Sequence, residues 1–304
     1  MKRLIVFLTI ADLGARDDST IPNHFVTQFD SDVQLVMQQT KSRLEDTVTP
    51  HPGIVGSSKA VDRMGEVEPE EMTERHGDTR ITEADHQRRY IDLRDYNVAL
   101  LLDKADEWKI LADPTNKYTQ GSVAGMNRKK DKVIIAALFG NARNVANALV
   151  ALPAEQKVLA NNEPITMAKL RAAIEIHNAN EMDSPEEGGE RTFVFNSTVL
   201  TTLMAEPQIT SADYNTLQAL MDFKVDFFMG MKWKRVEFLP KTAAGVRSCA
   251  IYGKSYIGFG TGAQVKNRLS ERADKNHAKQ TYTEMSIGAV RIEDKGVVEI
   301  QCQE

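Results

Sequence analysis

One charged stretch, ERHGDTRITEADHQRRYIDLRDY at residues 74–96, constrains the fold most because it holds too few apolar residues to fill a core. Its 23 residues include six acids, five arginines and two histidines. Charged residues alternate with β-forming ones over residues 87–93, and Gly77-Asp78 offers a turn between two such runs. The pattern predicts a two-stranded hairpin. An isolated hairpin is marginal in water, so we expect it to lie on a neighbouring molecule.

The rest of the chain has the composition of a folded protein. Of its 304 residues, 41% are hydrophobic and 27% are charged, which supplies enough apolar material for a core. The net charge of −5 argues against a protein that grips nucleic acid through bulk charge, because such domains are usually basic. Cys249 and Cys302 form no CxxC pair, which disfavours a disulfide framework or a cysteine zinc site. No run approaches the ~20 apolar residues of a membrane span, and residues 4–11 are predicted to form a packed strand.

Hydrophobic periodicity predicts helices and strands that do not alternate regularly. Helical spacing marks residues 25–48, 122–152 and 166–180, with Gly140 as a bend or an end of the second helix. A turn is expected at 113–118, and another helix after Ser211 and Asp213. Strands are predicted at 191–196, 236–239, 249–252 and 256–259, and two or three more across 280–301, whereas 265–272 is expected to be helical. The mixture indicates fold class α+β.

Several fragments resemble the motifs of nucleotide-binding enzymes, and each has a simpler explanation. The run GFGTG at 258–262 follows a predicted strand, but too few residues remain for a dinucleotide-binding sheet, so a tight turn is favoured. The triplet Gly253-Lys254-Ser255 lacks the first glycine of a P-loop, because that position holds Ser248. The basic run at 128–132 is either a solvated helix face or a contact for a partner's acids.

A metal site is the strongest enzymatic alternative. His76, Asp78, Asp85 and His86 carry nitrogen and oxygen ligands, and a metal-dependent hydrolase built on them would be a metal-binding monomer or small oligomer. A catalytic metal requires a dry, supported shell, whereas these residues lie in a segment with almost no apolar neighbours. A solvated loop is the favoured interpretation. We therefore expect no catalytic residue, no metal and no cofactor.

The order of these segments resembles the major capsid proteins of tailed bacteriophages of the Hong Kong ninety-seven type, and more closely the podovirus-like phage capsid protein family. The resemblance covers about residues 25–302, and it is the order of the segments that is specific. The segments are ERHGDTRITEADHQRRYIDLRDYNVALLLDKAD, DPTNKY, Met126-Asn127-Arg128 with Asp131 before an apolar helix, RTFVFN, SADYNTLQALM, FFMGMKWKRVEFLP and EMSIGAVRIEDKGVVEIQC.

The resemblance implies an N-terminal arm (1–54), an extended β-hairpin loop (55–96), a peripheral domain (97–190 and 273–304) with a spine helix at 122–152, and an axial domain (191–272). The chain would be a major capsid protein that self-assembles into pentamers and hexamers, forming the icosahedral head shell around double-stranded DNA. It would reside in the virion capsid after assembly in the host cytoplasm. Scaffold, portal and decoration proteins are the expected partners. An encapsulin-like compartment for protein cargo is the alternative with the same fold.

In this family the extended loop lies across an adjacent subunit, which nominates two groups of contact residues. The loop group is Glu74, Arg75, Asp78, Arg80, Glu83, Asp85, Arg88, Arg89, Asp92, Arg94 and Asp95. The spine-helix group is Arg128, Lys129, Lys130 and Asp131. Some relatives cross-link this loop through lysine, but residues 61–83 contain no lysine, so we expect no such cross-link.

Overall fold

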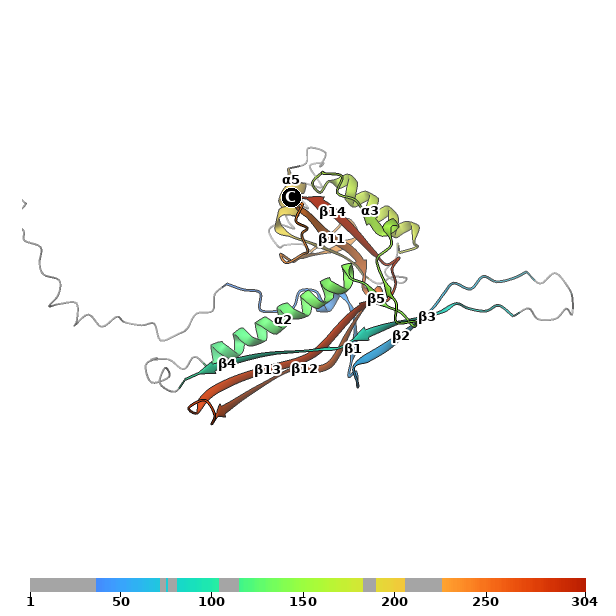
Figure 1. Ribbon diagram of the computed structural model, residues 1–304. Coiled ribbons are helices and arrows are strands. Elements are labelled where there is room, and N and C mark those ends of the chain that lie inside the picture. Colours follow the sequence, from blue (N-terminus) through green and yellow to red (C-terminus); the bar gives the residue numbers. More distant parts are fainter. Residues whose placement is uncertain (1–36, 72–74, 76–80, 104–114, 183–189, 206–225) are drawn as a thin grey trace, which may run out of the picture.

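The computed structural model describes residues 37–71, 75, 81–103, 115–182, 190–205 and 226–304. It consists of two β-sheets, a long helix between them and a hairpin that leaves the body (Figure 1). The predicted strand at 4–11, the helix after Ser211 and the first part of the helix at 25–48 lie outside the described residues. Among the described helices, none combines the length and the hydrophobicity that crossing a bilayer requires.

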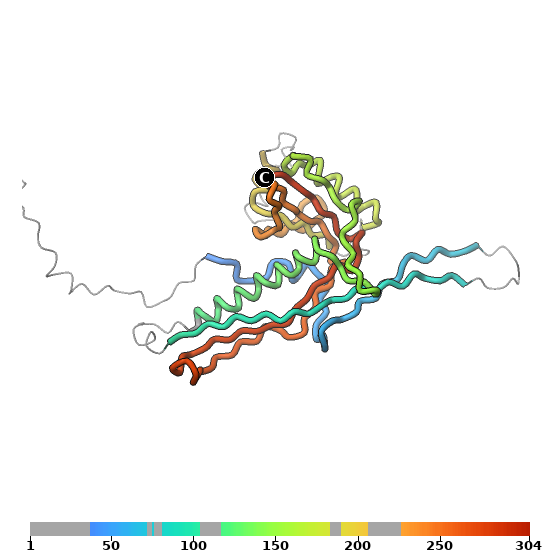
Figure 2. Tube along the Cα trace, in the orientation of Figure 1, coloured from blue at the N-terminus to red at the C-terminus, as the bar shows by residue number. Residues whose placement is uncertain are grey.

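The first sheet has four strands in the order β1-β12-β13-β4. Strands β12 (Ile257–Arg272) and β13 (Ala278–Arg291) form a long antiparallel pair. Strand β4 (Arg94–Leu102) lies along β13, and the short β1 (Thr49–Pro52) pairs in parallel with the start of β12. One face of this sheet is covered by α2 (Thr115–Phe139), as Figure 2 shows. The helix buries Met126, Ile134 and Leu138 in the core that both sheets share.

The second sheet has six strands in the order β7-β14-β11-β8-β10-β9. Its strands are β7 (Lys157–Val158), β14 (Val297–Gln303), β11 (Val246–Gly253), β8 (Arg191–Phe195), β10 (Met231–Arg235) and β9 (Phe227–Phe228). Helix α3 (Met167–Ala179) packs on β14, and α5 (Ser197–Met204) follows β8. Phe193, Phe195 and Trp233 form an aromatic cluster with ring centroids 4.8–5.6 Å apart, which favours close packing.

Smaller elements complete the chain. Strands β2 (Ser58–Met64) and β3 (His86–Asp92) form the two-stranded hairpin, and β5 (Ala142–Arg143) pairs with β6 (Leu149–Val150) directly after α2. The described residues also form three turns of 3₁₀ helix: η3 (Glu45–Thr47), η4 (Ala154–Gln156) and η5 (Lys254–Tyr256).

Several predicted boundaries were wrong. The spine helix begins at Thr115, where a turn was expected, and it ends at Phe139 instead of continuing to 152. A side chain at Gly140 would collide with the Ala136 carbonyl oxygen, so the helix stops on a residue without one, and β5 and β6 follow. Residues 37–48 contain no α-helix, 236–239 are not a strand, and 265–272 belong to β12 instead of a helix. The α3 helix and the β8 strand were predicted correctly.

The strands are divided between the two sheets differently from the predicted segments. Strand β12 was placed in the axial segment, but it pairs with β13 beside the long helix. Strand β14 was placed in the peripheral segment, but it pairs with β11 in the six-stranded sheet. The chain therefore enters the second sheet after the long helix, leaves it through β12 and β13, and returns with its last strand.

The last turn of α3 contains a buried histidine whose protonation opposes folding. His177 is fully buried, and burial lowers its pKa to about 4, an effect to which the charge of Arg191 adds. In the unfolded chain histidine titrates near 6.5, so acid favours the unfolded state. This contribution to stability is complete above the unfolded pKa and is lost as the pH falls from about 6.5 towards 4, by about 3 kcal/mol in all.

The substitution His177→Leu should therefore reduce the pH dependence of stability. Between pH 7 and pH 4.5 the wild-type free energy of unfolding should fall about 2–3 kcal/mol further than that of the variant, measured by urea denaturation. His86→Leu is the matched control, because His86 is exposed on β3. Equal pH dependence in the wild type and the His177 variant would contradict the argument.

Candidate inter-subunit hairpin

The β2–β3 hairpin is held in register by paired charges. The strands pair in antiparallel fashion from Ser58 opposite Asp92 to Met64 opposite His86. Asp62 and Arg88 are direct partners joined by an ion pair, whose hydrogen bond lowers the pKa of the aspartate. This pair is exposed, so it contributes little stability, but it distinguishes the correct register from a shifted one. The predicted strand around 87–93 is confirmed, whereas the predicted turn at Gly77-Asp78 lies outside the described residues.

The root of the hairpin is fixed by a buried cluster of two arginines and one aspartate. Asp294 accepts from Arg89 Nη2 at 2.9 Å and from Arg291 Nε at 2.6 Å. Arg89 comes from β3 and also reaches the carbonyl of Ala142. Arg291 is 0% exposed at the end of β13. The cluster therefore joins the hairpin to the segment that links the two sheets.

The same cluster also caps the long helix. Arg291 donates to the carbonyl oxygens of Leu138 at 3.1 Å and Gly140 at 2.8 Å, and to that of Val150 at 3.2 Å. A cation at the C-terminus of a helix satisfies orphan carbonyls and interacts favourably with the helix dipole. The orientation of the hairpin is thus coupled to the end of α2.

Glycines in the four-stranded sheet form the surface on which the hairpin root lies. A Cβ at Gly260 would be 2.5 Å from Ile54 Cδ1 and 2.7 Å from Ile91 Cγ2. A Cβ at Gly288 would be 2.8 Å from the carbonyl carbon of Asp92 and closer still to its oxygen. The GFGTG run is therefore neither a phosphate loop nor the predicted turn. It lies within β12, where the absence of side chains lets β3 approach the sheet.

The predicted loop residues fall into different environments. Glu74, Asp78 and Arg80 lie outside the described residues, whereas Arg75 and Glu83 are exposed and, in the described part, without a polar partner. Asp85 accepts from the Gln87 amide. Asp92 pairs with Arg143, whose guanidinium also lies over the Tyr90 ring. Arg94 and Asp95 are exposed on β4, at the edge of its sheet.

Arg89 differs from the exposed members of the loop group. It is buried within its own subunit and pairs with Asp294. Removing the Arg89 side chain, or replacing it with an acidic one, would take this ion pair away from Asp294. The charge of Arg89 cannot be reversed without disturbing the fold, in contrast to that of Arg88.

Three of the four residues in the spine-helix group contact residues 38–45 of the same subunit. Buried Asp131 accepts from the Ser42 hydroxyl at 2.5 Å and from the backbone N–H groups of Arg43 and Leu44 at 3.0–3.2 Å. Arg128 donates to Gln38 and Gln39, and Lys130 pairs with Glu45 at 2.8 Å. Lys129 lies 4.5 Å above the Tyr96 ring. The acidic residue that this basic run contacts is thus Glu45 of the same chain.

The metal-site hypothesis gains no support. His76 and Asp78 lie outside the described residues, and among those described no group of three potential ligands comes together. Asp85 and His86 are exposed at the far end of the paired strands.

Asp294 and Arg291 were missed by the sequence analysis. The signal for Arg291 was its place in the alternation of β13, where Met285 and Ile287 on the same face are buried. A charge at such a core-facing position implies a buried partner. Asp294 has no comparable signal, because it lies in the turn between β13 and β14.

A family model described as phage capsid protein matches residues 21–304, nearly the whole chain. The chain belongs to the phage capsid protein family. The capsid structure of cyanophage P-SCSP1u is similar to this phage capsid protein with a TM-score of 0.72 at 14% identity, covering 93% of this chain and 94% of the other. No curated protein matched the sequence.

Two further phage structures have the same fold as this capsid protein. The head structure of Helicobacter pylori bacteriophage KHP40 gives a TM-score of 0.71 at 12% identity and covers 99% of each chain. The capsid of Ralstonia phage GP4 gives a TM-score of 0.70 at 12% identity and covers 96% of this chain and 97% of the other. The predicted α+β capsid fold is confirmed by these similarities, and the predicted function as a major capsid protein of a phage head shell is confirmed by the family. The encapsulin-like and hydrolase alternatives are not favoured.

Proposed function

We propose that this capsid protein self-assembles into pentamers and hexamers through the β2–β3 hairpin, which lies across an adjacent subunit. The observation that carries the proposal is that the hairpin leaves the body of its own subunit (Figure 1). Beyond the paired strands, the described residues are almost all exposed, and Ile81 is 88% exposed. Burying such an exposed apolar side chain against a partner is favourable, because it removes apolar surface from water.

In this proposal the four-stranded sheet with α2 is the peripheral domain, and the six-stranded sheet with α3 and α5 is the axial domain around the five- and six-fold axes. A net charge of −5 suits an icosahedral shell that encloses double-stranded DNA without gripping it. Assembly takes place in the cytoplasm of the bacterial host, with scaffold, portal and decoration proteins as partners.

The test shortens the hairpin without touching its root. Residues 66–84 are replaced by Asn-Gly, which joins Gly65 to Asp85, two residues whose backbones already form a 2.7 Å hydrogen bond. The variant should keep the melting temperature of the full chain, because the described residues of the removed segment are almost all exposed. Negative-stain electron microscopy and light scattering should show rings or shells for the full chain and only monomers for the variant.

A Gly/Ser segment of equal length in place of 66–84 is the control for loop length, and it should fail to assemble as well. A shortened variant that assembles like the full chain would overturn the proposal. A full chain that stays monomeric at every salt and protein concentration would contradict it too.

A further inference from the structure

The fold brings the two cysteines of the chain together, although they lie far apart in the sequence. Cys249 is on β11 and Cys302 is on β14, and both are buried, with 0% and 1% of their surface exposed. The antiparallel register places Cys249 opposite Ile300, two positions before Cys302. The cysteines are therefore diagonal neighbours on one face of the six-stranded sheet, where side chains are close enough to touch.

The two thiols are in contact, and they differ in how readily they ionise. Cys249 donates a hydrogen bond to the Cys302 sulfur, and Cys302 donates to the Arg247 carbonyl oxygen at 3.4 Å. Accepting the bond from Cys249 lowers the pKa of Cys302, and the charges of Lys169 and Arg247 add to this effect against the burial of the thiol. Donating that bond, together with full burial, raises the pKa of Cys249. Because the thiolate is the nucleophile, Cys302 is the more reactive of the two.

Cys302 lies near the end of the β11–β14 pairing, where the sheet opens most readily. Only one residue pair lies beyond it in the register, and both members of that pair are half-buried. The carboxylate of Glu304 holds this end, because it accepts from Asn196 at 2.6 Å and pairs with Arg247 at 2.7 Å. Strand ends open far more often than a whole protein unfolds, so Cys302 meets solvent without global unfolding.

We propose that Cys249 and Cys302 form a disulfide when the protein meets a small-molecule disulfide as oxidant. The Cys302 thiolate attacks the oxidant, forms a mixed disulfide and expels one reduced thiol. The Cys249 thiolate then attacks the Cys302 sulfur, forms the bond between the two cysteines and expels the second reduced thiol. The two protein thiols are oxidised, the oxidant is reduced to two thiols, and the protons of the protein thiols pass to these leaving groups.

The bond ties the last strand of the sheet covalently to its neighbour. A disulfide spans less distance than a diagonal pair ordinarily does, so β11 and β14 draw together slightly when it forms. The cross-link closes the segment 249–302, and such a bond stabilises a protein mainly by constraining its unfolded chain. Thiols persist in reducing compartments and oxidise outside them, so the bond distinguishes a capsid protein that has left a reducing compartment from one still inside.

The test exposes the full chain to oxidised glutathione, a small-molecule disulfide, without denaturant. Thiols are then counted in urea with a chromogenic reagent, and the intact mass separates an internal disulfide, which has lost two hydrogen atoms, from a glutathione adduct. The wild type should lose both thiols, retain no glutathione and form no disulfide-linked dimer on a non-reducing gel. Its oxidised form should melt at a higher temperature than its reduced form.

Three variants separate the steps of the reaction. Cys249→Ala should stop at the glutathione adduct on Cys302, because no second thiol can resolve it. Cys302→Ala should react at least about tenfold more slowly than Cys249→Ala, since the remaining thiol is fully buried and ionises less readily. Glu304→Ala, with both cysteines present, should form the disulfide about tenfold faster than the wild type, because fewer charged contacts oppose the opening of the strand end.

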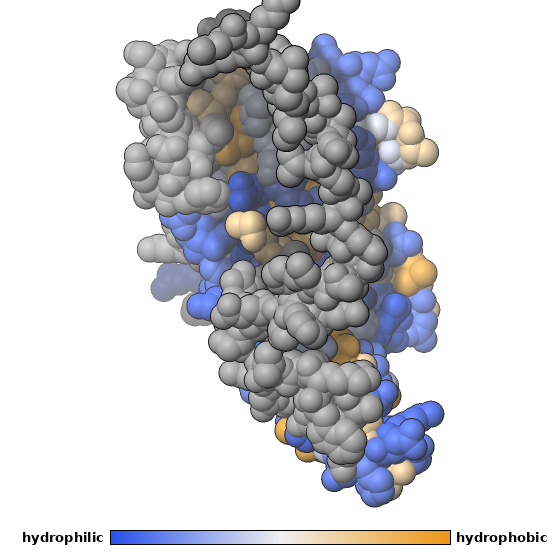
Figure 3. Space-filling model, turned by 90° about the vertical axis from the view of Figure 1, so that its left-hand side faces the viewer, coloured by the Kyte–Doolittle hydropathy of each residue, from blue (hydrophilic) through white to orange (hydrophobic). Residues whose placement is uncertain are grey.

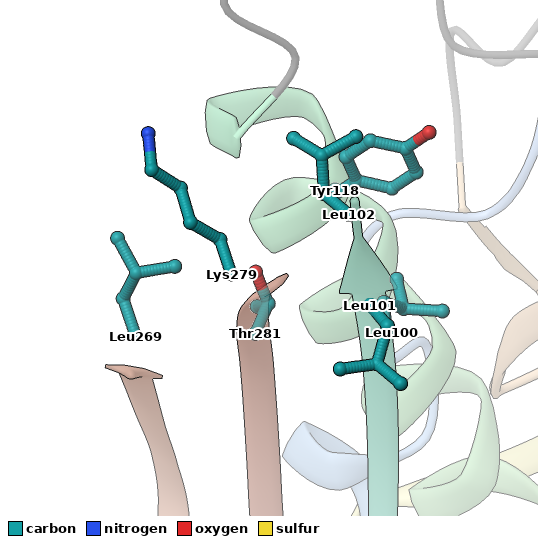
Figure 4. Close-up of a pocket in the computed structure, with 7 residues that line it drawn as sticks. All are labelled: Leu100, Leu101, Leu102, Tyr118, Leu269, Lys279 and Thr281. Carbon is teal, nitrogen blue, oxygen red and sulfur yellow. The ribbon is translucent and has the colours of Figure 1, made fainter. Parts of the chain in front are cut away.

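An exposed thiol elsewhere in the chain is the control for unhindered reaction. It is made by Leu269→Cys in a chain that also carries Cys249→Ala and Cys302→Ala. Leu269 is 57% exposed on β12, beside a shallow depression that Tyr118 also lines (Figure 4). Figure 3 shows the lower end of this sheet as mostly hydrophilic surface with isolated hydrophobic residues. The control thiol should acquire glutathione fastest of all and keep it.

Three results would overturn the proposal. Wild-type thiols that both survive after the control thiol has reacted completely would show that the strand end does not open. A lasting glutathione adduct on the wild type, or disulfide-linked dimers, would show that the two thiols do not reach each other within one chain. An oxidised form that melts below the reduced one would show that the bond does not fit the native sheet. The inference is independent of the proposed function, which the shortened hairpin tests separately.

Discussion

Substituting Asp294 by Ala should lower the free energy of unfolding by about 3–5 kcal/mol, the range for removing one partner of a buried ion pair. The reason is that Arg89 and Arg291 are almost completely buried and share this one carboxylate. Without it, two guanidinium charges lie close together away from water. Arg291 would keep its carbonyl partners at the end of α2, so the largest local change is expected at the hairpin root.

Urea denaturation measures the stability, and hydrogen exchange of the β3 backbone locates the change. Asp274→Ala is the matched control: Asp274 also pairs with an arginine, Arg272, but both side chains are exposed. Its loss should change the stability only slightly, because water screens an exposed ion pair. Asp294→Asn keeps the size of the side chain but not its charge. Its loss of stability should lie between the losses for Asp294→Ala and Asp274→Ala. Equal effects at positions 294 and 274 would refute the role given to the cluster.

The second large effect is expected for Gly288→Ala. The added methyl group would lie against the Asp92 carbonyl, a backbone group that cannot rotate away. Either β13 or the hairpin root must shift, and overpacking of this kind typically costs about 1–3 kcal/mol. We expect the upper end of that range, together with loss of ring formation, because the displaced root reorients the whole hairpin.

The same substitution at Gly125 should have the opposite sign. Gly125 lies inside α2, and its nearest contact for a Cβ would be the flexible end of Arg128 at 3.7 Å. Alanine in a helix interior is better than glycine by about 1 kcal/mol. Thermal denaturation of both variants measures the two stability changes. A stabilised Gly288→Ala protein would show that the hairpin root does not need a glycine at position 288.

Patterns of local sequence predicted much of this fold. The spine helix was found because its apolar residues recur at helical spacing in a segment rich in Ala, Leu and Met. Strand β3 was found because charges alternate with β-forming residues such as Tyr90 and Ile91. Strand β12 was taken for a helix over 265–272 because most of its residues there are exposed, so no apolar alternation marks it. An edge strand of this kind carries little hydrophobic signal.

The root of the hairpin could not be predicted for a different reason. Arg89 and Asp294 are 205 residues apart, and their pairing depends on how the hairpin lies on the sheet. The glycines of β12 were visible in the sequence, but their purpose depends on Ile54 and Ile91, which approach from distant segments. Function was predicted from the order of segments, whereas the junction that positions the hairpin emerges only from the assembled subunit.

The strand order of the six-stranded sheet determines how much of the chain must be present before that sheet is complete. Strand β14 comes after every other strand of that sheet in the sequence, yet it lies between β7 and β11. Strand β1 likewise pairs in parallel with β12, which lies more than 200 residues later in the sequence. Such long-range pairing is slow. A polypeptide cut before residue 297 therefore lacks an inner strand of the six-stranded sheet, and we expect such a product to be excluded from a growing shell.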